Sequence, residues 1–218
     1  MRKYPECLMD PSRIALVIID HEPQMYFGVE SHTRSRIINN VTALAKAAKV
    51  FNVPCILTTV EAQQFSGMLI QNVQKVYPDY TPIDRTSINC WEDDNLRKAV
   101  EFTKRKEIVL AGLWTEACVL FPALSMKQDG YKVDVVADAC GGWSAEAHEM
   151  AIKRMIQAGV IPMTWQQCML EWQRDWGNKD TYDAVMGVIQ EHSGAYGIGV
   201  EYANSMITNK QPEGMLTY

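Results

Sequence analysis

Short runs of apolar, mostly β-branched residues alternate along this chain with longer segments of helical period. Residues 14–19 (IALVII) are apolar at every position, as in a strand whose two faces are both covered by helices. Further runs of this kind, and the helical segments between them, predict a three-layer α/β/α fold around a parallel sheet of about six strands. The other strands are expected at residues 54–59, 108–111, 133–137 and 160–163, and the main helices at residues 33–50, 95–103, 116–129, 145–158, 166–175 and 182–190.

The length of 218 residues suits one domain, and the sequence contains neither an internal repeat nor a low-complexity linker. We therefore predict a single domain over residues 1–193, followed by a C-terminal tail at residues 194–218. The tail is rich in Gly, Asn and Thr and lacks an apolar period. It is expected to be either disordered or ordered against a neighbouring subunit, where it would take part in subunit contacts.

Charge and cysteine usage exclude several classes of protein. With 21 Lys and Arg against 26 Asp and Glu, the net charge is −5, which argues against a nucleic-acid-binding protein. No apolar run reaches the roughly 18 residues of a membrane span. The N-terminus, MRKYPEC, carries Pro and Glu where a signal peptide would be apolar, so a cytoplasmic location is expected. The six cysteines form no CxxC pair, which argues against disulfides and structural zinc and predicts free thiols.

Reactive side chains follow the predicted strands. Asp20 follows the first strand, Cys118 lies in the turn that leaves the strand at residues 108–111, and Arg85 lies between them in sequence. Taken singly, a turn aspartate, a small buried thiol and a surface arginine need no function. Ligands of parallel sheets, however, bind at the carboxyl ends of the strands. A cysteine at the opening turn of a helix is expected to have a lowered pKa, beside N–H groups that can bind an oxyanion. A nearby carboxylate can accept its proton, and a cation can hold that carboxylate in place.

The span from Ala15 to about Trp176 resembles the isochorismatase-like, or cysteine hydrolase, family. The resemblance is carried by Asp20 within ALVIIDHEPQ and by residues 111–142, AGLWTEACVLFPALSMKQDGYKVDVVADACGG. The motif SINCW, the run TEACVLFPAL, and MTW before a helix with Trp and Arg are similar to the YcaC-like branch of hydrolases within that family. The resemblance implies the Rossmann-like hydrolase fold of the family.

The resemblance also implies roles for individual residues. Cys118 is implied as the nucleophile, which forms a thioester with a small amide, ester or related acyl substrate, and Asp20 as its base. The third member of the family's triad is usually Lys, and the matching position here holds Arg85. Because Arg does not release its proton, only electrostatic support of Asp20 and the thiolate is open to it. The family also implies a cis peptide bond at Leu113–Trp114 and an oxyanion hole formed by the N–H groups of Trp114 and Cys118.

The sequence departs from the metal-binding members of this family. Nicotinamidases of this family bind metal through an aspartate and closely spaced histidines after the second strand. Residues 58–66 (TTVEAQQFS) contain neither residue, and the four histidines form no HxxxH pair, so we predict no metal. No cofactor is expected either, because no GxGxxG follows a strand. Candidate substrate-binding residues, some of which could equally belong to the core or to an interface, are Phe65, Asn89, Trp91 and Thr115.

Two questions stay open at the level of sequence. The alternative to a hydrolase is a catalytically weak scaffold, or a protein whose Cys118 is a redox-sensitive thiol. The presence of Asp20 favours the enzyme, since a sensor needs no base beside its thiol.

Assembly is the second question, and we expect a homo-oligomer, with more than two subunits compatible with the sequence. Aromatic residues are common in interfaces, and the C-terminal quarter holds Trp165, Trp172, Trp176 and Tyr182.

Overall fold

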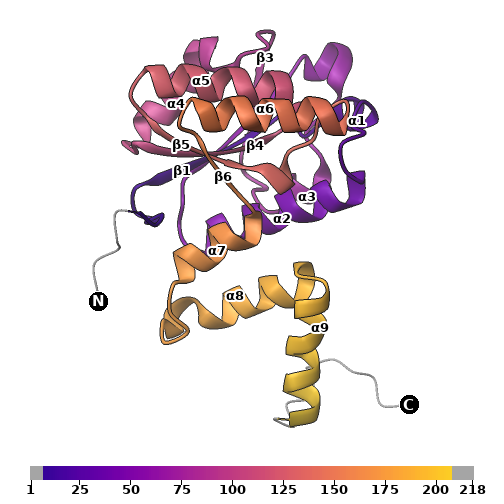
Figure 1. Cartoon of the computed structure of the whole chain (residues 1–218), viewed down its shortest axis with the longest axis vertical. Coiled ribbons are helices and arrows are strands. Elements are labelled where there is room, and N and C mark those ends of the chain that lie inside the picture. Colours follow the sequence, from indigo (N-terminus) through magenta and orange to yellow (C-terminus); the bar gives the residue numbers. More distant parts are fainter. Residues whose placement is uncertain (1–6, 208–218) are drawn as a thin grey trace. The chain divides into compact units, whose positions relative to one another are not determined.

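The computed structural model describes residues 7–207 and contains a six-stranded parallel sheet (Figure 1). The strand order is β3-β2-β1-β4-β5-β6, and all neighbouring strands pair in parallel. This confirms the predicted α/β fold and the number of strands. The strands are β1 (Ile14–Ile19), β2 (Cys55–Val60), β3 (Ile83–Arg85), β4 (Glu107–Gly112), β5 (Lys132–Val136) and β6 (Ile161–Met163).

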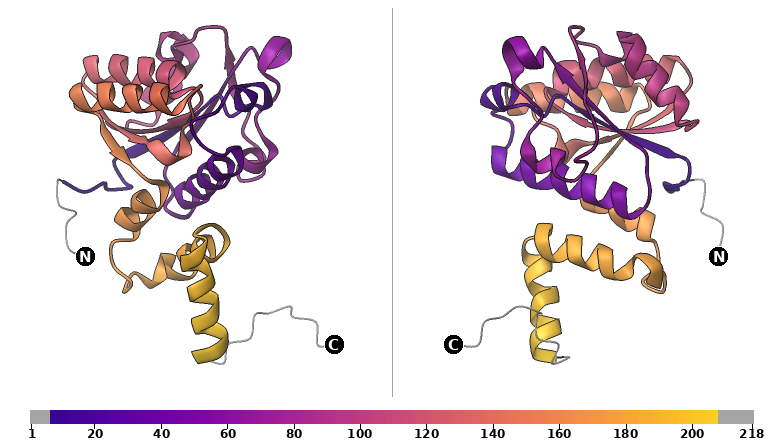
Figure 2. Two further views of the ribbon diagram at one scale, coloured as in Figure 1. Left: turned by 45° about the vertical axis from the view of Figure 1, so that its right-hand side comes forward. Right: turned by 180° about the vertical axis from the view of Figure 1, so that it is seen from behind.

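Helices cover both faces of the sheet (Figure 2). One layer contains α4 (Asp94–Phe102), α5 (Leu120–Gln128) and α6 (Ala145–Gln157), and the other contains α2 (Arg34–Val50) and α7 (Trp165–Gln173). Because helices lie on both sides, all six residues of β1 are fully buried, which explains why this strand is apolar throughout. Side chains that accept N–H groups mark two helix starts: Asp93 at α4 and Ser144 at α6.

The strand order brings the candidate residues to one edge of the sheet. The direction of the connections reverses between β1 and β4, which are adjacent strands at the centre. Ile19 and Gly112, the last residues of these two strands, lie side by side. The segments that follow them therefore leave the sheet next to each other, at the position where open parallel sheets bind ligands. The shorter elements at this edge include α1 (Pro23–Phe27), the π-helical turns η1 (Ala62–Ser66) and η3 (Thr115–Val119), and α3 (Gln71–Gln74).

The chain separates after Trp172 into two compact units. The second unit begins at Gln173 and contains α8 (Lys179–His192), α9 (Ala195–Tyr202), which packs against α8, and a π-helical turn at Ala203–Ile207. Part of the predicted tail is thus helical. Its sequence, AYGIGVEY, shows no amphipathic period because the helix is apolar on most sides. Residues 208–218, which the predicted tail also includes, lie outside the described residues.

Two of the aromatic residues expected at a subunit contact belong to the core of the chain itself. Trp165 is 4% exposed and Trp172 is 1% exposed, and the Trp172 ring lies edge-on against Phe51 at 5.9 Å between centroids. Trp176, which remains 42% exposed, contacts Tyr182 within the second unit.

Among the helices of residues 7–207, none combines the length and apolar character that a membrane crossing requires.

Candidate active site

Asp20 occupies the first position after β1. Its backbone adopts a left-handed conformation with φ of 55°, which Asp tolerates better than most residues. Its N–H donates to the carbonyl of Thr58 on β2 at 3.0 Å, so the turn is tied to the neighbouring strand. The side chain is fully buried. A carboxylate in such a place needs a charged or hydrogen-bonding partner, and the structure provides two.

Arg85 is the first partner of Asp20. It is the last residue of β3, which lies two strands away from β1, and its long side chain reaches across the end of β2. The Nη2 group lies 2.8 Å from both carboxylate oxygens of Asp20, and neither side chain is exposed. Nη1 donates to the carbonyl of Ser87, which fixes the loop that follows β3. The structure therefore brings together the base and cation expected from the sequence.

Cys118 is the second partner of Asp20. It lies in η3, the π-helical turn between β4 and α5, and is 4% exposed. Its thiol is hydrogen-bonded to the Asp20 carboxylate, and the backbone N–H of Trp114 donates to its sulfur. The Leu113–Trp114 peptide bond at the start of this turn is cis, at the position that the resemblance implied. Asp20 thus lies between the guanidinium and the thiol.

Burial dominates the electrostatics of the site. It raises the pKa of Asp20 from 3.8 to about 6, although the positive charge of Arg85 acts in the opposite direction. Burial also raises the pKa of the Cys118 thiol, and the adjacent Asp20 carboxylate raises it further. The expectation of a lowered thiol pKa is therefore wrong for the resting protein. The α-helix begins only at Leu120, two residues after the cysteine, so Cys118 lies outside the first helical turn, where the effect of the helix dipole is concentrated. Cys118 rests as a thiol that needs a base.

The four candidate substrate-binding residues lie in different environments. The Asn89 side chain caps the Trp91 N–H and donates to Glu92 and Ser125. Trp91 is 5% exposed, and its indole N–H donates to Asp129 at the far end of α5, so it packs in the core.

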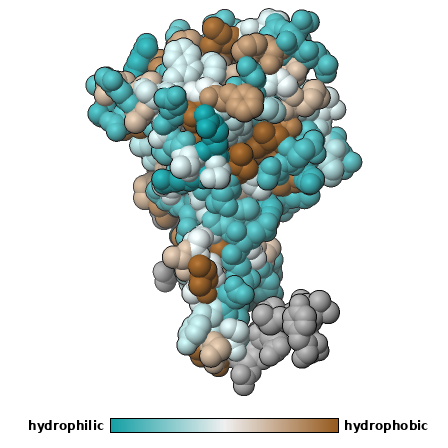
Figure 3. Space-filling view, turned by 90° about the vertical axis from the view of Figure 1, so that its right-hand side faces the viewer, coloured by the Kyte–Doolittle hydropathy of each residue, from teal (hydrophilic) through white to brown (hydrophobic). Residues whose placement is uncertain are grey.

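Thr115 is buried beside the nucleophile, and its hydroxyl lies 2.8 Å from Nδ1 of His148 on α6. Phe65, on η1, is 62% exposed. Phe65 lies at the edge of the sheet where the strands end, where other apolar residues are also exposed. Figure 3, which views the molecule from the side that carries α1, shows apolar side chains among polar ones. Of the four residues, only Thr115 belongs to η3, the turn that carries Cys118.

The sequence reasoning missed a second buried carboxyl, Glu22. This residue is fully buried two positions after Asp20, and its Oε2 accepts the N–H of Val60 at 3.0 Å. The adjacent His21 is also fully buried, with Nδ1 2.7 Å from the hydroxyl of Tyr26. The available signal was the run of three polar residues, DHE, directly after an apolar strand. Within the described part of the chain, no group of three or more His, Cys, Asp or Glu side chains could hold a metal ion.

Comparison with known proteins gives a consistent picture. Residues 14–167 match the family model of the isochorismatase domain. The chain is 37% identical over 175 residues to the probable hydrolase YcaC of Escherichia coli, across 80% of this chain and 84% of that protein. The structure of that protein, described as an octameric hydrolase of unknown specificity, matches 94% of this chain and 100% of its own with a TM-score of 0.88 at 33% identity. The structure of YcaC from Pseudomonas aeruginosa was solved with hexane-2,5-diol and covalent acrylamide. It matches 91% of this chain and 98% of its own chain, with a TM-score of 0.86 at 32% identity.

Proposed function

The chain belongs to the isochorismatase family, and on that premise we propose that it is a cysteine hydrolase that acts on a small amide, ester or related acyl substrate. The observation that carries the proposal is the position of the Asp20 carboxylate, which is paired with Arg85 on one side and hydrogen-bonded to the Cys118 thiol on the other. A nucleophile, a base in contact with it and a group that orients the base are the parts that acyl transfer requires.

The first half of the proposed reaction forms a thioester. Sγ of Cys118 attacks the acyl carbon while its proton passes to Asp20, whose pKa of about 6 leaves it ionised at neutral pH. The resulting oxyanion is bound by the backbone N–H groups of Trp114 and Cys118. When the tetrahedral intermediate collapses, the bond to the leaving group breaks. The departing amine or alcohol takes the proton from Asp20, and the acyl group remains on sulfur.

The second half releases the product. Asp20 removes a proton from a water molecule, the hydroxide attacks the thioester carbon, and the C–S bond breaks. The proton held by Asp20 returns to the sulfur of Cys118, which restores the thiol. Arg85 keeps its proton throughout, because the Asp20 carboxylate holds its pKa above the ordinary value despite burial. Its role is to fix the carboxylate and to balance its charge.

The burial of Cys118 supports this proposal over a redox-sensitive thiol. A redox sensor depends on a thiol whose pKa is lowered and which is accessible to oxidants. Burial raises the pKa of the Cys118 thiol and leaves it only 4% exposed. The thiol therefore suits activation by its own base at the moment of reaction.

We also propose that the protein is a homo-oligomer larger than a dimer. The E. coli relative, which this chain matches over 94% of its length, is described as octameric. The second unit of this chain has apolar residues in contact with solvent, among them Ile198 at 68% and Tyr202 at 59% exposure. Apolar surface of this kind is common where subunits meet. The remaining proposed partner is the small-molecule substrate.

A substrate screen with matched variants tests the proposed function. Purified protein is offered small amides, esters, ureas and nitriles, and product release is measured for the parent, Cys118→Ala and Cys168→Ala. Cys168 is fully buried on α7 against Met9 and is unrelated to the site, so its variant controls for loss of a buried thiol. We expect Cys118→Ala to lose turnover and Cys168→Ala to retain it. Turnover that survives in folded Cys118→Ala would refute the proposal.

A further inference from the structure

Buried polar atoms without a partner gather at the exits of β1, β2 and β3. Native proteins pair nearly all such atoms, so a cluster of them marks a place where a further molecule makes hydrogen bonds. The residues of this cluster lie close to the catalytic pair along the chain. His21 and Glu22 follow Asp20 directly, and Arg85 is itself a member of the cluster. Among the described residues, the atoms without a hydrogen-bond partner here are His21 Nε2, Glu22 Oε1, Ser66 Oγ, Arg85 Nε and Ser87 Oγ.

Glu22 is the acidic member of this cluster. Its N–H donates to the carbonyl of Asp20 at 2.8 Å, and its Oε2 accepts the N–H of Val60 at the end of β2. The carboxyl lies within the electrostatic reach of Asp20, Asp84 and Arg85. One oxygen is thus anchored to the backbone, while Oε1 is buried and free to bind something else.

Ser66 lies on the segment that follows β2. It ends η1, which packs against α1, the helix that begins one residue after Glu22. The start of η1 is fixed to β3, since the N–H of Ala62 donates to Asp84 at 3.1 Å. The serine is 1% exposed although its hydroxyl is unpaired. A hydroxyl buried in this way is available as a donor or an acceptor.

The charges of the region balance without an anion. The guanidinium of Arg85 contacts both oxygens of Asp20 through Nη2, so the charge of Asp20 compensates its positive charge, while its Nε–H remains as a neutralised donor without a partner. Burial raises the pKa of Glu22 to about 8, an effect increased by the carboxylates of Asp20 and Asp84 and opposed by the Val60 N–H and by Arg85. Burial lowers the pKa of His21 to about 3. At neutral pH, therefore, Glu22 is mostly an uncharged acid, whose Oε1 can donate a hydrogen bond, and His21 is neutral.

We propose that Glu22 and Ser66 form a hydrogen-bonding subsite beside the catalytic centre, and that this subsite selects uncharged polar substrates such as small amides and ureas over carboxylates. The inference rests on the proposed function, because the subsite has a role only if Cys118 reacts. A neutral amide can both donate to and accept from these groups. A carboxylate would enter beside Asp20 with no unpaired cation to compensate its charge.

Two alkylating reagents that differ mainly in charge test this inference. Iodoacetamide and iodoacetate are reacted with Cys118 in a Cys7→Ser background, because Cys7 is the exposed thiol of the chain. The ratio of the two rates is divided by the same ratio for N-acetylcysteine. We expect the protein to favour iodoacetamide by about tenfold or more at neutral pH, the effect of placing an anion beside Asp20. Asp134→Asn, which changes a buried carboxyl on β5, serves as the control and should leave the ratio unchanged.

Variants of Glu22 identify the group responsible. Glu22→Leu should slow alkylation by iodoacetamide about fivefold, the effect of one lost hydrogen bond. Glu22→Gln keeps a donor and an acceptor and tests the charge by itself. In the parent, the preference for iodoacetamide should rise between about pH 7 and pH 9, as Glu22 ionises and repels the anion, whereas in Glu22→Gln it should stay constant.

The outcomes separate the two proposals. If Cys118 of the folded parent reacts no faster than the buried Cys140 and Cys168, the proposed function itself fails. If Cys118 reacts but the normalised ratio is close to one, or the parent and Glu22→Gln show the same pH dependence, the subsite inference is overturned while the nucleophile stands. Should Glu22→Leu not fold, the comparison of the parent with Glu22→Gln still decides.

Discussion

The replacement of Asp20 by Asn should change both the rate and the pH dependence of Cys118 alkylation. In the parent, the base has a pKa of about 6, so about 90% of it is ionised at pH 7 and about 10% at pH 5. Alkylation by iodoacetamide should therefore fall about ninefold from pH 7 to pH 5. Between about pH 7 and pH 8 it should reach a plateau, because Asp20 is then almost fully ionised, Glu22 still holds its proton, and burial keeps the pKa of the thiol raised.

The variant has no base and should behave differently in two ways. At pH 7 its alkylation rate should be lower by about a hundredfold or more, within the range that general bases usually contribute. The rate should also rise about tenfold with each pH unit and show no plateau, since it then depends on the thiolate fraction of an unassisted thiol. Asn preserves the size of the side chain and one acceptor for Arg85, so the comparison concerns mainly the proton.

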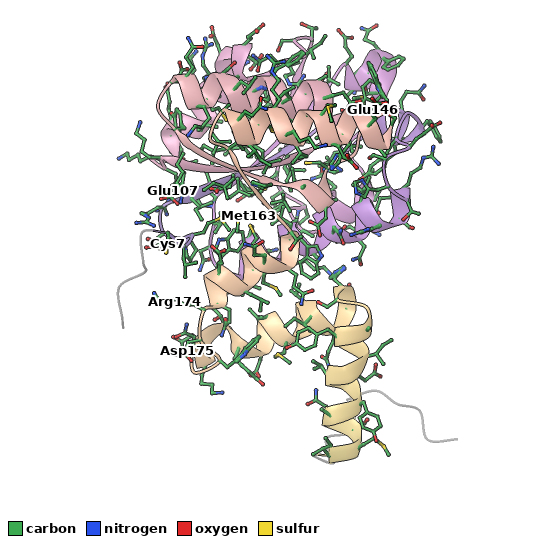
Figure 4. The ribbon with its side chains drawn as sticks, in the orientation of Figure 1. Cys7, Glu107, Glu146, Met163, Arg174 and Asp175 are labelled. Atoms are coloured by element: carbon green, nitrogen blue, oxygen red, sulfur yellow. The ribbon has the colours of Figure 1, made fainter. Side chains whose placement is uncertain are left out.

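The assay is rapid-quench alkylation followed by peptide mapping, in the Cys7→Ser background. Cys7 lies on the same side of the molecule as Glu107, where β4 begins (Figure 4). Because Cys7 is exposed, its alkylation would compete with that of Cys118. Because disruption of a buried ion pair costs about 3–5 kcal/mol, thermal melting must show that the variant is folded at the assay temperature. A folded Asp20→Asn variant with the rate and plateau of the parent would refute the role of Asp20 as the base.

Two further predictions concern stability and assembly. Burial raises the pKa of Asp134 from 3.8 to about 6, so its ionisation opposes folding increasingly between these two pH values and fully above about pH 6. Asp134→Asn should therefore raise the free energy of unfolding by about 3 kcal/mol at pH 7.5 and by little at pH 4. Urea unfolding measures both values, and a variant and parent of equal stability at pH 7.5 would contradict this prediction. Light scattering at micromolar concentration should give a particle of more than twice the chain mass of 24.7 kDa, and a monomer or dimer mass would exclude the proposed assembly.

The parts of the fold that depend on local sequence could be predicted from it. The run IALVII coincides with β1, because a strand buried on both faces must be apolar at every position. The helix at 145–158 was placed to within a residue of α6, since Ser144 caps its start and Gly159 follows its end. The convergence of Asp20, Arg85 and Cys118 followed from the topology of parallel sheets together with a family resemblance.

Features that depend on tertiary burial could not be predicted in this way. The sequence indicates that Cys118 precedes a helix, but only the structure shows how deeply the thiol is buried beside a carboxylate, which reverses the expected pKa shift. The size and position of Trp172 predict an interface residue, yet it packs against Phe51 from a distant part of the chain. The sequence assigns no role to Glu22, because its complete burial depends on segments that are distant along the chain.

The two carboxyls at the exit of β1 together define a window of pH for the proposed chemistry. Asp20, with a pKa of about 6, must lose its proton to act as a base, so activity should rise as the pH passes that value. Glu22, with a pKa of about 8, must keep its proton to donate from Oε1, so that contribution should disappear above it. Arg85 makes this separation possible, since its charge stabilises the ionised form of Asp20 through direct contact and acts on Glu22 only from a distance. Two acids in one turn thus take opposite protonation states at neutral pH, as an enzyme needs when one group accepts a proton and the other donates a hydrogen bond.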